Sequence, residues 1–233
     1  MNFENTEVFN FESALRGMRN PLNSWSKGDS IVYDDDTITK NYQGKSLGEN
    51  TPMKVYIGPN DLNLAQRLIL AGNEHAKFMR QIFVSVDITA PIYFWKEFDT
   101  YKVGTVANST STMHKLATTP IELSCFEIDD YDEEWFRNTG IEPACDTWIE
   151  DNIIFFLEML RQKYLETKDT RYWKELVRWL PEGFLQTRTI TMSYANLRNI
   201  YFQRRDHKLQ EWAVFCDWIK TLPYSKELIT YEG

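Results

Sequence analysis

The spacing of apolar positions predicts two helices in the first part of the chain. Residues 11–19 have helical spacing, and Asn20-Pro21 ends this helix because the residue before a proline avoids the helical region. Asp61 can cap a second helix that runs through Leu70. That helix is expected to turn three apolar side chains inward: Leu64, Leu68 and Ile69.

Alternating positions predict strands in the middle of the chain. Residues 81–88 alternate β-branched side chains with other residues, which indicates a strand. A short helix can precede this strand over residues 73–80. Pro91 suits the first turn of a helix that ends near Phe98. Residues 100–112 then indicate a strand that passes into a loop.

The second half of the chain is predicted to be mainly helical. Asp146 can cap a long helix, and Pro181 ends a further one. Residues 185–192 alternate like a strand, and helices follow at about 194–205 and 208–221. The long helix is expected to bury one stripe of side chains: Ile149, Ile153, Phe156, Leu157, Leu160 and Tyr164.

The resulting order of elements is α–β–α–β–α–α–β–α–α. This order predicts a mixed α/β or α+β fold, with a sheet and flanking helices. No repeat or low-complexity segment divides the chain, so we expect one domain over residues 1–233. Residues 20–52, rich in Asn, Asp, Gly and Ser, form a loop-rich segment within it, with at most one short strand.

Composition and charge exclude several classes of protein. The 233 residues are 42% hydrophobic and 15% aromatic, which suits a folded domain with a sizeable core and not a disordered chain. No stretch approaches the ~18 uninterrupted apolar residues of a membrane span. The net charge of -8 argues against nonspecific nucleic-acid binding. The first seven residues do not resemble a signal peptide, and three scattered cysteines fit a reduced, cytoplasmic protein.

Several motifs of known chemistry are missing. Gly44-Lys45-Ser46 looks like the end of a phosphate loop, but Thr39 stands where the leading glycine belongs. The sequence has no GxGxxG motif. Histidine and cysteine never fall at zinc spacing, so no metal is expected.

Residues 97–115 form the first candidate binding segment. Between positions 104 and 112 nearly every residue is Ser, Thr, Asn, Gly or Ala. Hydroxyls and backbone N–H groups there could grip a phosphate, with Lys102 or Lys115 adding charge. The alternative is a solvated turn whose hydroxyls bond their own backbone.

Residues 193–212 form the second candidate segment, where an acidic chain gathers positive charge in Arg198, Arg204, Arg205 and Lys208. Helical spacing brings three amide side chains near one another: Asn196, Asn199 and Gln203. An anionic ligand would need such a patch. The alternative is a solvated helix face whose cations pair with carboxylates.

In this order and separation, the two segments resemble the flavin-dependent thymidylate synthase family. That family has a helix of the type N-x-R-x-L-x-N-x(4)-R followed by A-Q-W-E. Leu197, Asn199 and Arg204 match this pattern, and residues 210–212 approximate its ending. Serine and alanine replace the first Asn and Arg.

The earlier segment stands at the place of the family signature R-H-R-x(2)-S-x-N-E-x-S-x-R-Y. Its hydroxyls survive as Thr105 and Thr110 and one base survives as Lys102, whereas the leading Arg, the His, the Asn, the Glu and the late Arg are lost. His75 precedes a strand, as a histidine does in the family, although a lone histidine is more often a capping or core residue. Ser24 is similar to a family serine that contacts flavin.

The resemblance implies an α/β homotetramer that binds flavin adenine dinucleotide (FAD) and a small-molecule nucleotide. In the family, FAD carries hydride from a reduced nicotinamide such as NADPH. A methylene group from methylenetetrahydrofolate then passes to the uracil ring of deoxyuridine monophosphate, and no cysteine nucleophile is needed. The chain also looks like a group of proteins from gut-bacterial phages and prophages.

On this basis, Arg204 and Lys102 are the predicted catalytic residues. The predicted cofactor-binding residues are Ser24, His75, Asn199 and Arg204, and the predicted substrate-binding residues are Lys102, Thr105 and Thr110. The lost arginines weaken phosphate binding, because threonine cannot replace a guanidinium fork. Four cations could compensate for that loss: Lys102, Lys115, Arg188 and Arg198.

The expected function is that of a divergent flavin-dependent nucleotide-modifying enzyme, such as a pyrimidine methylase or hydroxymethylase of phage DNA precursors. The alternative is a catalytically inactive, oligomeric phage protein that binds a nucleotide or a host protein.

Overall fold

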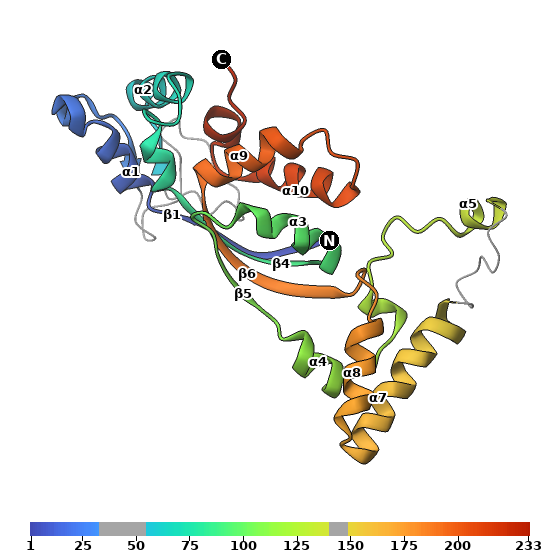
Figure 1. Ribbon diagram of the computed structural model, residues 1–233. Helices are drawn as coiled ribbons and strands as arrows, with labels where there is room; N and C mark the ends of the chain where they lie inside the picture. Colours follow the sequence, from blue (N-terminus) through green and yellow to red (C-terminus); the bar gives the residue numbers. More distant parts are fainter. Residues whose placement is uncertain (33–54, 140–148) are drawn as a thin grey trace, which may run out of the picture. The chain divides into compact units, whose positions relative to one another are not determined.

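The computed structural model describes residues 1–32, 55–139 and 149–233 (Figure 1). Three sequence predictions lie outside these ranges: Asp146 as a helix cap, the Gly44-Lys45-Ser46 segment, and most of the loop-rich segment. The chain divides into two compact units. Unit 1 comprises residues 1–2, 88–100 and 108–189, and unit 2 comprises residues 3–87, 101–107 and 190–233.

Four strands form the main sheet, in the order β1 (Asn2–Phe9), β4 (Phe83–Pro91), β6 (Leu185–Ser193) and β5 (Val106–Ser109). Hydroxyl contacts between Ser85 and Thr191 and between Thr89 and Thr187 show that β4 and β6 run antiparallel. Along β4 the side chains at positions 84, 86, 88 and 90 are buried, and those between them are half-buried. The predicted mixed α/β fold is confirmed.

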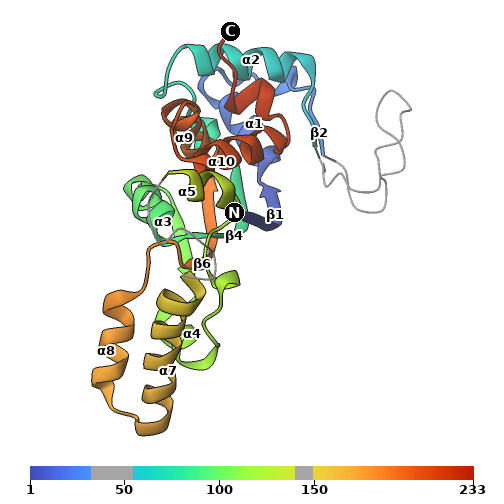
Figure 2. The ribbon, with the colours of Figure 1, turned by 90° about the vertical axis from the view of Figure 1, so that its right-hand side faces the viewer.

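In unit 2, the helices are α1 (Phe11–Met18), α2 (Pro59–Leu70), α9 (Tyr194–Arg204) and α10 (Gln210–Thr221). Short pieces complete it: 3-10 turns Asn20–Leu22, Trp25–Lys27 and Lys77–Arg80, the antiparallel strands β2 (Ile31–Val32) and β3 (Val55–Tyr56), and a π turn at Ser225–Ile229. α9 and α10 pack side by side (Figure 2). Buried aromatic side chains fill the core, among them Phe11, Tyr194, Trp212 and Phe215.

In unit 1, the helices are α3 (Ile92–Phe98), α4 (Thr112–Thr118), α5 (Glu133–Asn138), α7 (Phe155–Thr167) and α8 (Thr170–Trp179), with a π turn at Ile149–Ile154 and a 3-10 turn at Leu123–Cys125. A further 3-10 turn, Asp99–Tyr101, begins in unit 1 and ends at the first residue of the 101–107 segment of unit 2. α7 and α8 lie against each other as a helical hairpin (Figures 1 and 2). Their shared core with the neighbouring segments contains Leu116, Ile121, Ile154, Leu157, Leu176 and Phe184.

The prediction that Asp61 caps α2 is wrong. The helix begins two residues earlier, at Pro59, and its N-cap is Gly58, which has no side-chain cap. The cap comes from a distant residue, because the carboxylate of Asp29 accepts hydrogen bonds from the backbone N–H groups of Asn60 and Asp61. Asp61 itself is buried and turns its carboxylate to Arg19 instead.

The buried stripe of the long helix also differs from the prediction. Phe156 is exposed and Ile154 is buried in its place. The π turn at Ile149–Ile154 adds residues to one helical turn, so the buried face moves by about one position before α7 begins. A constant helical period applied across this segment therefore places Phe156 on the wrong face.

Among the elements that were not predicted are β1 and α4. β1 is an edge strand with only three partly buried positions, so its sequence carries little alternation. α4 begins inside the segment that we expected to be a loop, where the Ser111 side chain caps it by accepting from His114 N–H. Neither element has a long apolar period from which it could be recognised.

Candidate functional site

The N-terminus of α9 ties the helix to the turn that precedes β5. Ser193 caps α9 in a capping box with Asn196. The Asn196 amide nitrogen donates to the carbonyl oxygen of Val103 over 2.7 Å. Gly104 has a φ of +76°, and an added Cβ would stand 3.2 Å from Asn196 Oδ1, so this turn requires glycine. Residues 101–105 of the first candidate segment are thereby brought to α9, which lies in the second candidate segment.

Arg204, in the last turn of α9, is held against aromatic side chains. Its Nε–H donates to the Tyr101 hydroxyl over 2.8 Å. Its guanidinium carbon lies 4.6 Å from the ring centre of Trp212 and 5.6 Å from that of Tyr101. Trp212 is fully buried, and the Tyr101 ring meets it edge-on. The contacts that orient this planar cation therefore include both rings and the hydrogen bond to Tyr101.

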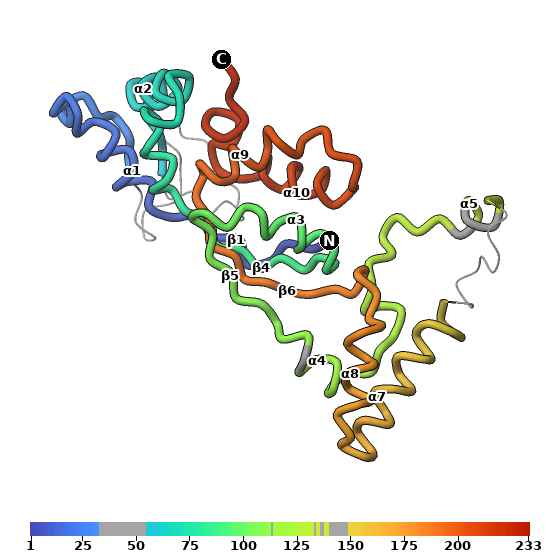
Figure 3. The backbone as a smooth tube through the Cα atoms, in the orientation of Figure 1, coloured from blue at the N-terminus to red at the C-terminus, as the bar shows by residue number. Residues whose placement is uncertain are grey.

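Two further side chains of α9 continue this contact. Tyr101 donates its hydroxyl proton to Gln203 Oε1 over 3.1 Å, and Gln203 Nε2 donates to Asn199 Oδ1 over 2.9 Å. The predicted proximity of Asn199 and Gln203 is confirmed. We refer to Tyr101, Asn199, Gln203, Arg204 and Trp212 as the arginine cluster. The backbone passes from α9 through a short turn into α10, which supplies Trp212 (Figure 3).

The sequence reasoning missed Tyr101 and Trp212 as partners of Arg204. Both stand beside residues that were singled out: Tyr101 precedes Lys102, and Trp212 ends the stretch similar to A-Q-W-E. The available signal was an aromatic residue within each candidate segment, since guanidinium groups stack on aromatic faces.

In unit 2, the predicted phosphate-binding residues Lys102 and Thr105 have different surroundings. Lys102 is exposed. The Thr105 hydroxyl donates to the Tyr101 carbonyl oxygen over 2.9 Å, and the Thr105 backbone N–H donates to the Lys102 carbonyl oxygen. The Thr105 hydroxyl therefore closes its own turn, as in the alternative of a self-bonded loop.

Thr110 lies in unit 1, at the end of β5, and is exposed. Its hydroxyl donates to the Thr187 carbonyl oxygen over 3.2 Å and accepts from the Thr187 N–H over 3.3 Å. Its backbone N–H also donates to Thr187. These contacts extend the pairing of β5 with β6. The Thr110 hydroxyl, like that of Thr105, is therefore bonded to the backbone.

Two of the four cations proposed to compensate for lost arginines are engaged elsewhere. Arg188, in unit 1, pairs with Asp99 at 2.7 Å and stacks over Trp95 at 4.4 Å. Arg198, in unit 2, donates to the carbonyl oxygens of Ile229 and Tyr231 and so fastens the C-terminal segment. Burial lowers the pKa of Arg198 from its usual value.

Ser24 and His75 make local contacts within unit 2. The carbonyl oxygen of Ser24 accepts from Arg19 Nη1 over 3.4 Å, and its N–H donates to the Arg19 carbonyl oxygen. His75 is exposed, and its N–H donates to Gly72. Their predicted roles beside a cofactor remain predictions.

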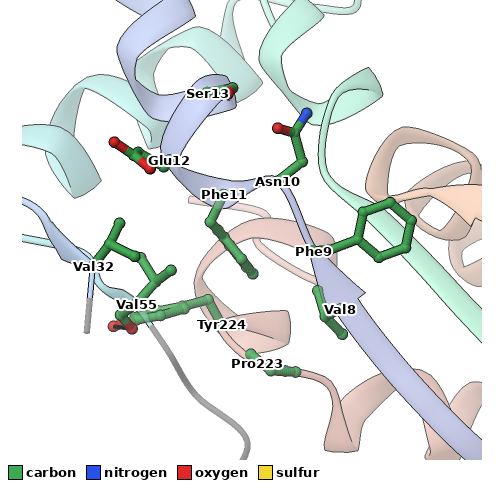
Figure 4. A pocket seen from close by; sticks show the side chains of 10 residues that line it. All are labelled: Val8, Phe9, Asn10, Phe11, Glu12, Ser13, Val32, Val55, Pro223 and Tyr224. Carbon is green, nitrogen blue, oxygen red and sulfur yellow. Dashed lines mark hydrogen bonds between the residues drawn. The ribbon is translucent and has the colours of Figure 1, made fainter. Parts of the chain in front are cut away.

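A separate cavity of about 250 Å³ lies in unit 2 between α1, the end of β1 and Tyr224 (Figure 4). Phe11 points toward Tyr224 and Pro223, and the carboxylate of Glu12 is the charged group of the lining. None of the predicted site residues lines this cavity. Within the described ranges, no group of three or more His, Cys, Asp or Glu side chains could hold a metal ion, and no helix could cross a membrane.

The chain has a mixed α/β fold with an antiparallel sheet. This fold is similar to that of flavin-dependent thymidylate synthases. One such structure is ThyX from Helicobacter pylori complexed with FAD and dUMP, at a TM-score of 0.59 and 15% identity, covering 98% of this chain and 97% of that chain. A second, of the same enzyme with FAD and dUMP at 2.31 Å resolution, has a TM-score of 0.60 and 16% identity over the same shares. Comparison with protein-family models finds no match, and neither does comparison with curated proteins.

Proposed function

We propose that this chain is a divergent flavin-dependent nucleotide-modifying enzyme that transfers a methylene or methyl group to a deoxyuridylate-type pyrimidine nucleotide. The observation that carries the proposal is the placement of Arg204, which is oriented by Tyr101 and Trp212. It lies in the segment whose sequence resembles the family, on a fold similar to structures that contain FAD and dUMP.

The residues of the arginine cluster fit an anionic ligand with a flat ring, such as FAD. A diphosphate needs cations or N–H donors, and Arg204 and the exposed Lys102 supply two positive charges. Asn199 accepts from Gln203 through its oxygen, so its amide nitrogen is the atom with protons to donate. When bound, FAD would supply hydride transfer, with NADPH as reductant and methylenetetrahydrofolate as the carbon donor.

The protein's own groups would bind and orient the ligands. Arg204 attracts a phosphate or a ring oxygen and fixes its direction, because the guanidinium is already held in place. Lys102 adds a mobile point charge for the nucleotide phosphate. Thr105 and Thr110 would have to leave their backbone partners to donate to that phosphate, so we assign them a secondary part. Ser24 and His75 are proposed on the cofactor side from the resemblance alone.

Flavin binding tests this proposal. Purified protein should be yellow or should bind added FAD, followed by absorbance and by quenching of flavin fluorescence. Arg204→Ala should weaken binding by about 10–100-fold, since a charge-assisted contact contributes about 1.5–3 kcal/mol. Arg204→Lys keeps the charge without the fork and should bind with intermediate affinity. Lys174→Ala, which removes an exposed cation of α8 outside both candidate segments, is the matched control. A colourless protein with no affinity for FAD would refute the proposal.

The alternative is a catalytically inactive oligomeric protein that binds a nucleotide or a host protein. It is favoured by the hydroxyls of Thr105 and Thr110, which are both bonded to backbone groups. A thermal-shift screen against flavins, deoxynucleotides and folates separates the two functions, because a ligand of the native state raises the melting temperature. A shift with deoxynucleotides but not with flavins would support the alternative.

We further propose that residues 1–233 act as a single thymidylate-synthase-complementing-like domain and assemble as a cytoplasmic homotetramer. The fold likeness spans 98% of the chain, which supports one functional domain. The tetramer, the cytoplasmic location and a role with phage DNA precursors rest on the sequence resemblance. Light scattering after size-exclusion chromatography tests the tetramer, and a monomeric mass would exclude it.

A further inference from the structure

We infer that Tyr101 is a positioning residue, whose hydroxyl sets the orientation of Arg204 and, through Gln203, of Asn199. This inference deepens the proposed function and rests on it for its consequence, because Arg204 and Asn199 are the groups proposed to meet the ligand. The sequence pattern had grouped Gln203 with Asn196 and Asn199, but it had assigned no role to Tyr101.

The first step is the hydrogen bond between Arg204 and Tyr101. The Nε–H of Arg204 donates to Tyr101 Oη over 2.8 Å, which is a good length for a charge-assisted bond. Because Nε lies at the stem of the guanidinium group, a bond there restricts rotation of the whole plane. The guanidinium carbon lies 4.6 Å from the ring centre of Trp212, and this stacking fixes the plane of the guanidinium group. The ring face still allows the guanidinium to rotate within that plane. The hydrogen bond to the Tyr101 hydroxyl therefore adds a directional restraint to the stacking.

The second step is the transmission from Tyr101 to Asn199. The same hydroxyl that accepts from Arg204 donates its proton to Gln203 Oε1 over 3.1 Å, and Gln203 Nε2 donates to Asn199 Oδ1 over 2.9 Å. All three bonds run in one direction, away from the cation, so that each polarises the next. The direction fixes both amides: the oxygen of Gln203 faces Tyr101, and the oxygen of Asn199 faces Gln203.

The third step is the placement of Tyr101 itself. It ends the 3-10 turn Asp99–Tyr101, and its carbonyl oxygen accepts from the Thr105 hydroxyl. Two residues later, Val103 is bonded to Asn196 at the start of α9. The turn is thus held by one hydrogen bond within it, from Thr105 to Tyr101, and by one hydrogen bond to α9, from Asn196 to Val103. The hydroxyl of Tyr101 is held at a fixed position relative to the last turn of α9.

Phenylalanine at position 101 separates this role from packing. Tyr101→Phe removes the hydroxyl but keeps the ring that meets Trp212 edge-on and faces Arg204. Tyr101→His restores an acceptor in a smaller ring and is the rescue variant. Tyr164→Phe, on α7 in unit 1, is the matched control for loss of a tyrosine hydroxyl. Circular dichroism and thermal melts establish that each variant is folded.

The experiment has two measurements on the full-length protein. The first is the Nε–Hε signal of Arg204 in proton–nitrogen NMR spectra without ligand, assigned with Arg204→Lys. We expect a signal protected from solvent exchange in the wild type and in Tyr164→Phe, and at least about tenfold faster exchange in Tyr101→Phe. An unchanged exchange rate in Tyr101→Phe would overturn the inference, whatever the protein binds.

The second measurement is titration with FAD and, separately, with dUMP. We expect Tyr101→Phe to bind about tenfold more weakly than the wild type, with partial recovery in Tyr101→His. Wild-type binding that Tyr101→Phe leaves unchanged would overturn the positioning role while leaving the proposed function intact. If the wild type binds neither probe, the proposed function fails, and the NMR measurement still decides whether Tyr101 orients Arg204.

Discussion

Each compact unit contains an arginine–carboxylate pair whose guanidinium is almost fully buried, Arg19–Asp61 in unit 2 and Arg161–Glu158 in unit 1, and these two pairs differ in what they connect. In unit 2, Arg19 and Asp61 pair at 2.6 Å although 42 residues separate them, and both side chains are almost fully buried. In unit 1, Glu158 and Arg161 pair at 2.6 Å within one turn of α7, and Glu158 keeps about a quarter of its side chain exposed. The pair in unit 2 therefore joins two distant segments, whereas the pair in unit 1 forms within one helix and reaches other segments through the Ile121 N–H and the Ala117 carbonyl oxygen.

The partners of the carboxylates explain this difference. Asp61 also accepts from the Asp29 N–H and from both the N–H and hydroxyl of Ser30, so its carboxylate joins α1, the loop at 29–30 and α2. Glu158 accepts from the Ile121 N–H and from Gln162 besides Arg161. A buried charge that loses its partner is costly, and the cost rises with the number of segments it holds. We expect unit 2 to depend on its pair more strongly.

Asp61→Asn gives the largest expected effect. It removes the charge and leaves Arg19 buried without its carboxylate, so the free energy of unfolding should fall by about 3–5 kcal/mol. Urea denaturation followed by circular dichroism measures the change. Asp217→Asn, which breaks an exposed pair with Lys220 on α10, should stay within about 0.5 kcal/mol of the wild type. Equal effects of the two substitutions would contradict the comparison.

Gly58→Ala tests the same region through the backbone. An added Cβ would stand 2.4 Å from the Asp29 carbonyl oxygen and 2.2 Å from its Cγ, so the loop that caps α2 would have to move. We expect a loss of about 1–3 kcal/mol in urea denaturation. In unit 1, Gly183 has no such neighbour for its Cβ, and Gly183→Ala should be neutral or slightly stabilising. If Gly58→Ala left the free energy of unfolding unchanged, the loop at 29–30 would move at little cost, which would contradict this prediction.

Glu158→Gln is expected to have the smallest effect, about 1–2 kcal/mol at pH 7, because this pair is partly exposed. Burial alone would raise the pKa of Glu158, but hydrogen bonds from Arg161, Ile121 and Gln162 outweigh it and lower the pKa to about 2. The folded pKa lies below the ordinary value of 4.5, so the stabilisation is complete above pH 4.5 and is lost as the pH falls toward 2.

Urea midpoints at pH 7, 4.5 and 3 measure this dependence. The wild type should lose stability between the last two values more steeply than Glu158→Gln, which has no carboxylate to protonate. Glu166→Gln, which breaks an exposed pair with Lys163 on the same helix, should follow the wild-type curve. If the wild type and Glu158→Gln lost the same stability between pH 4.5 and pH 3, the Glu158 carboxylate would not contribute to this pH dependence.

The sequence predicted those elements whose apolar period is regular over several turns or residues. The strand at 83–91 and the helices α1, α2, α9 and α10 are present near their expected bounds. Prediction failed where one local feature broke the period or where a partner came from far along the chain. The π turn before α7 displaced Phe156 from the core, and Asp29 took the capping role assigned to Asp61.

The candidate site follows the same rule. Arg204 and Asn199 were singled out because helical spacing and the family pattern both fall within one short segment, and their role at a site stays a prediction. Tyr101 and Trp212 were not assigned, because their contact with Arg204 depends on how the turn before β5 packs against α9 and α10. The hydroxyls of Thr105 and Thr110 were equally suited by sequence to a phosphate or to the backbone, and their backbone contacts appear only in the folded chain.

The amino-acid sequence by itself determined the mixed α/β class, the buried faces of the regular elements and the cation-bearing helix at 194–204, because these follow from the spacing of side chains along one segment. Tertiary structure alone decided which carboxylate caps α2, which cations pair internally and how Arg204 is oriented. Those outcomes depend on short-range hydrogen bonds and ring contacts between segments up to about a hundred residues apart in the chain, and no local pattern encodes which of several equivalent partners will lie within 3 Å.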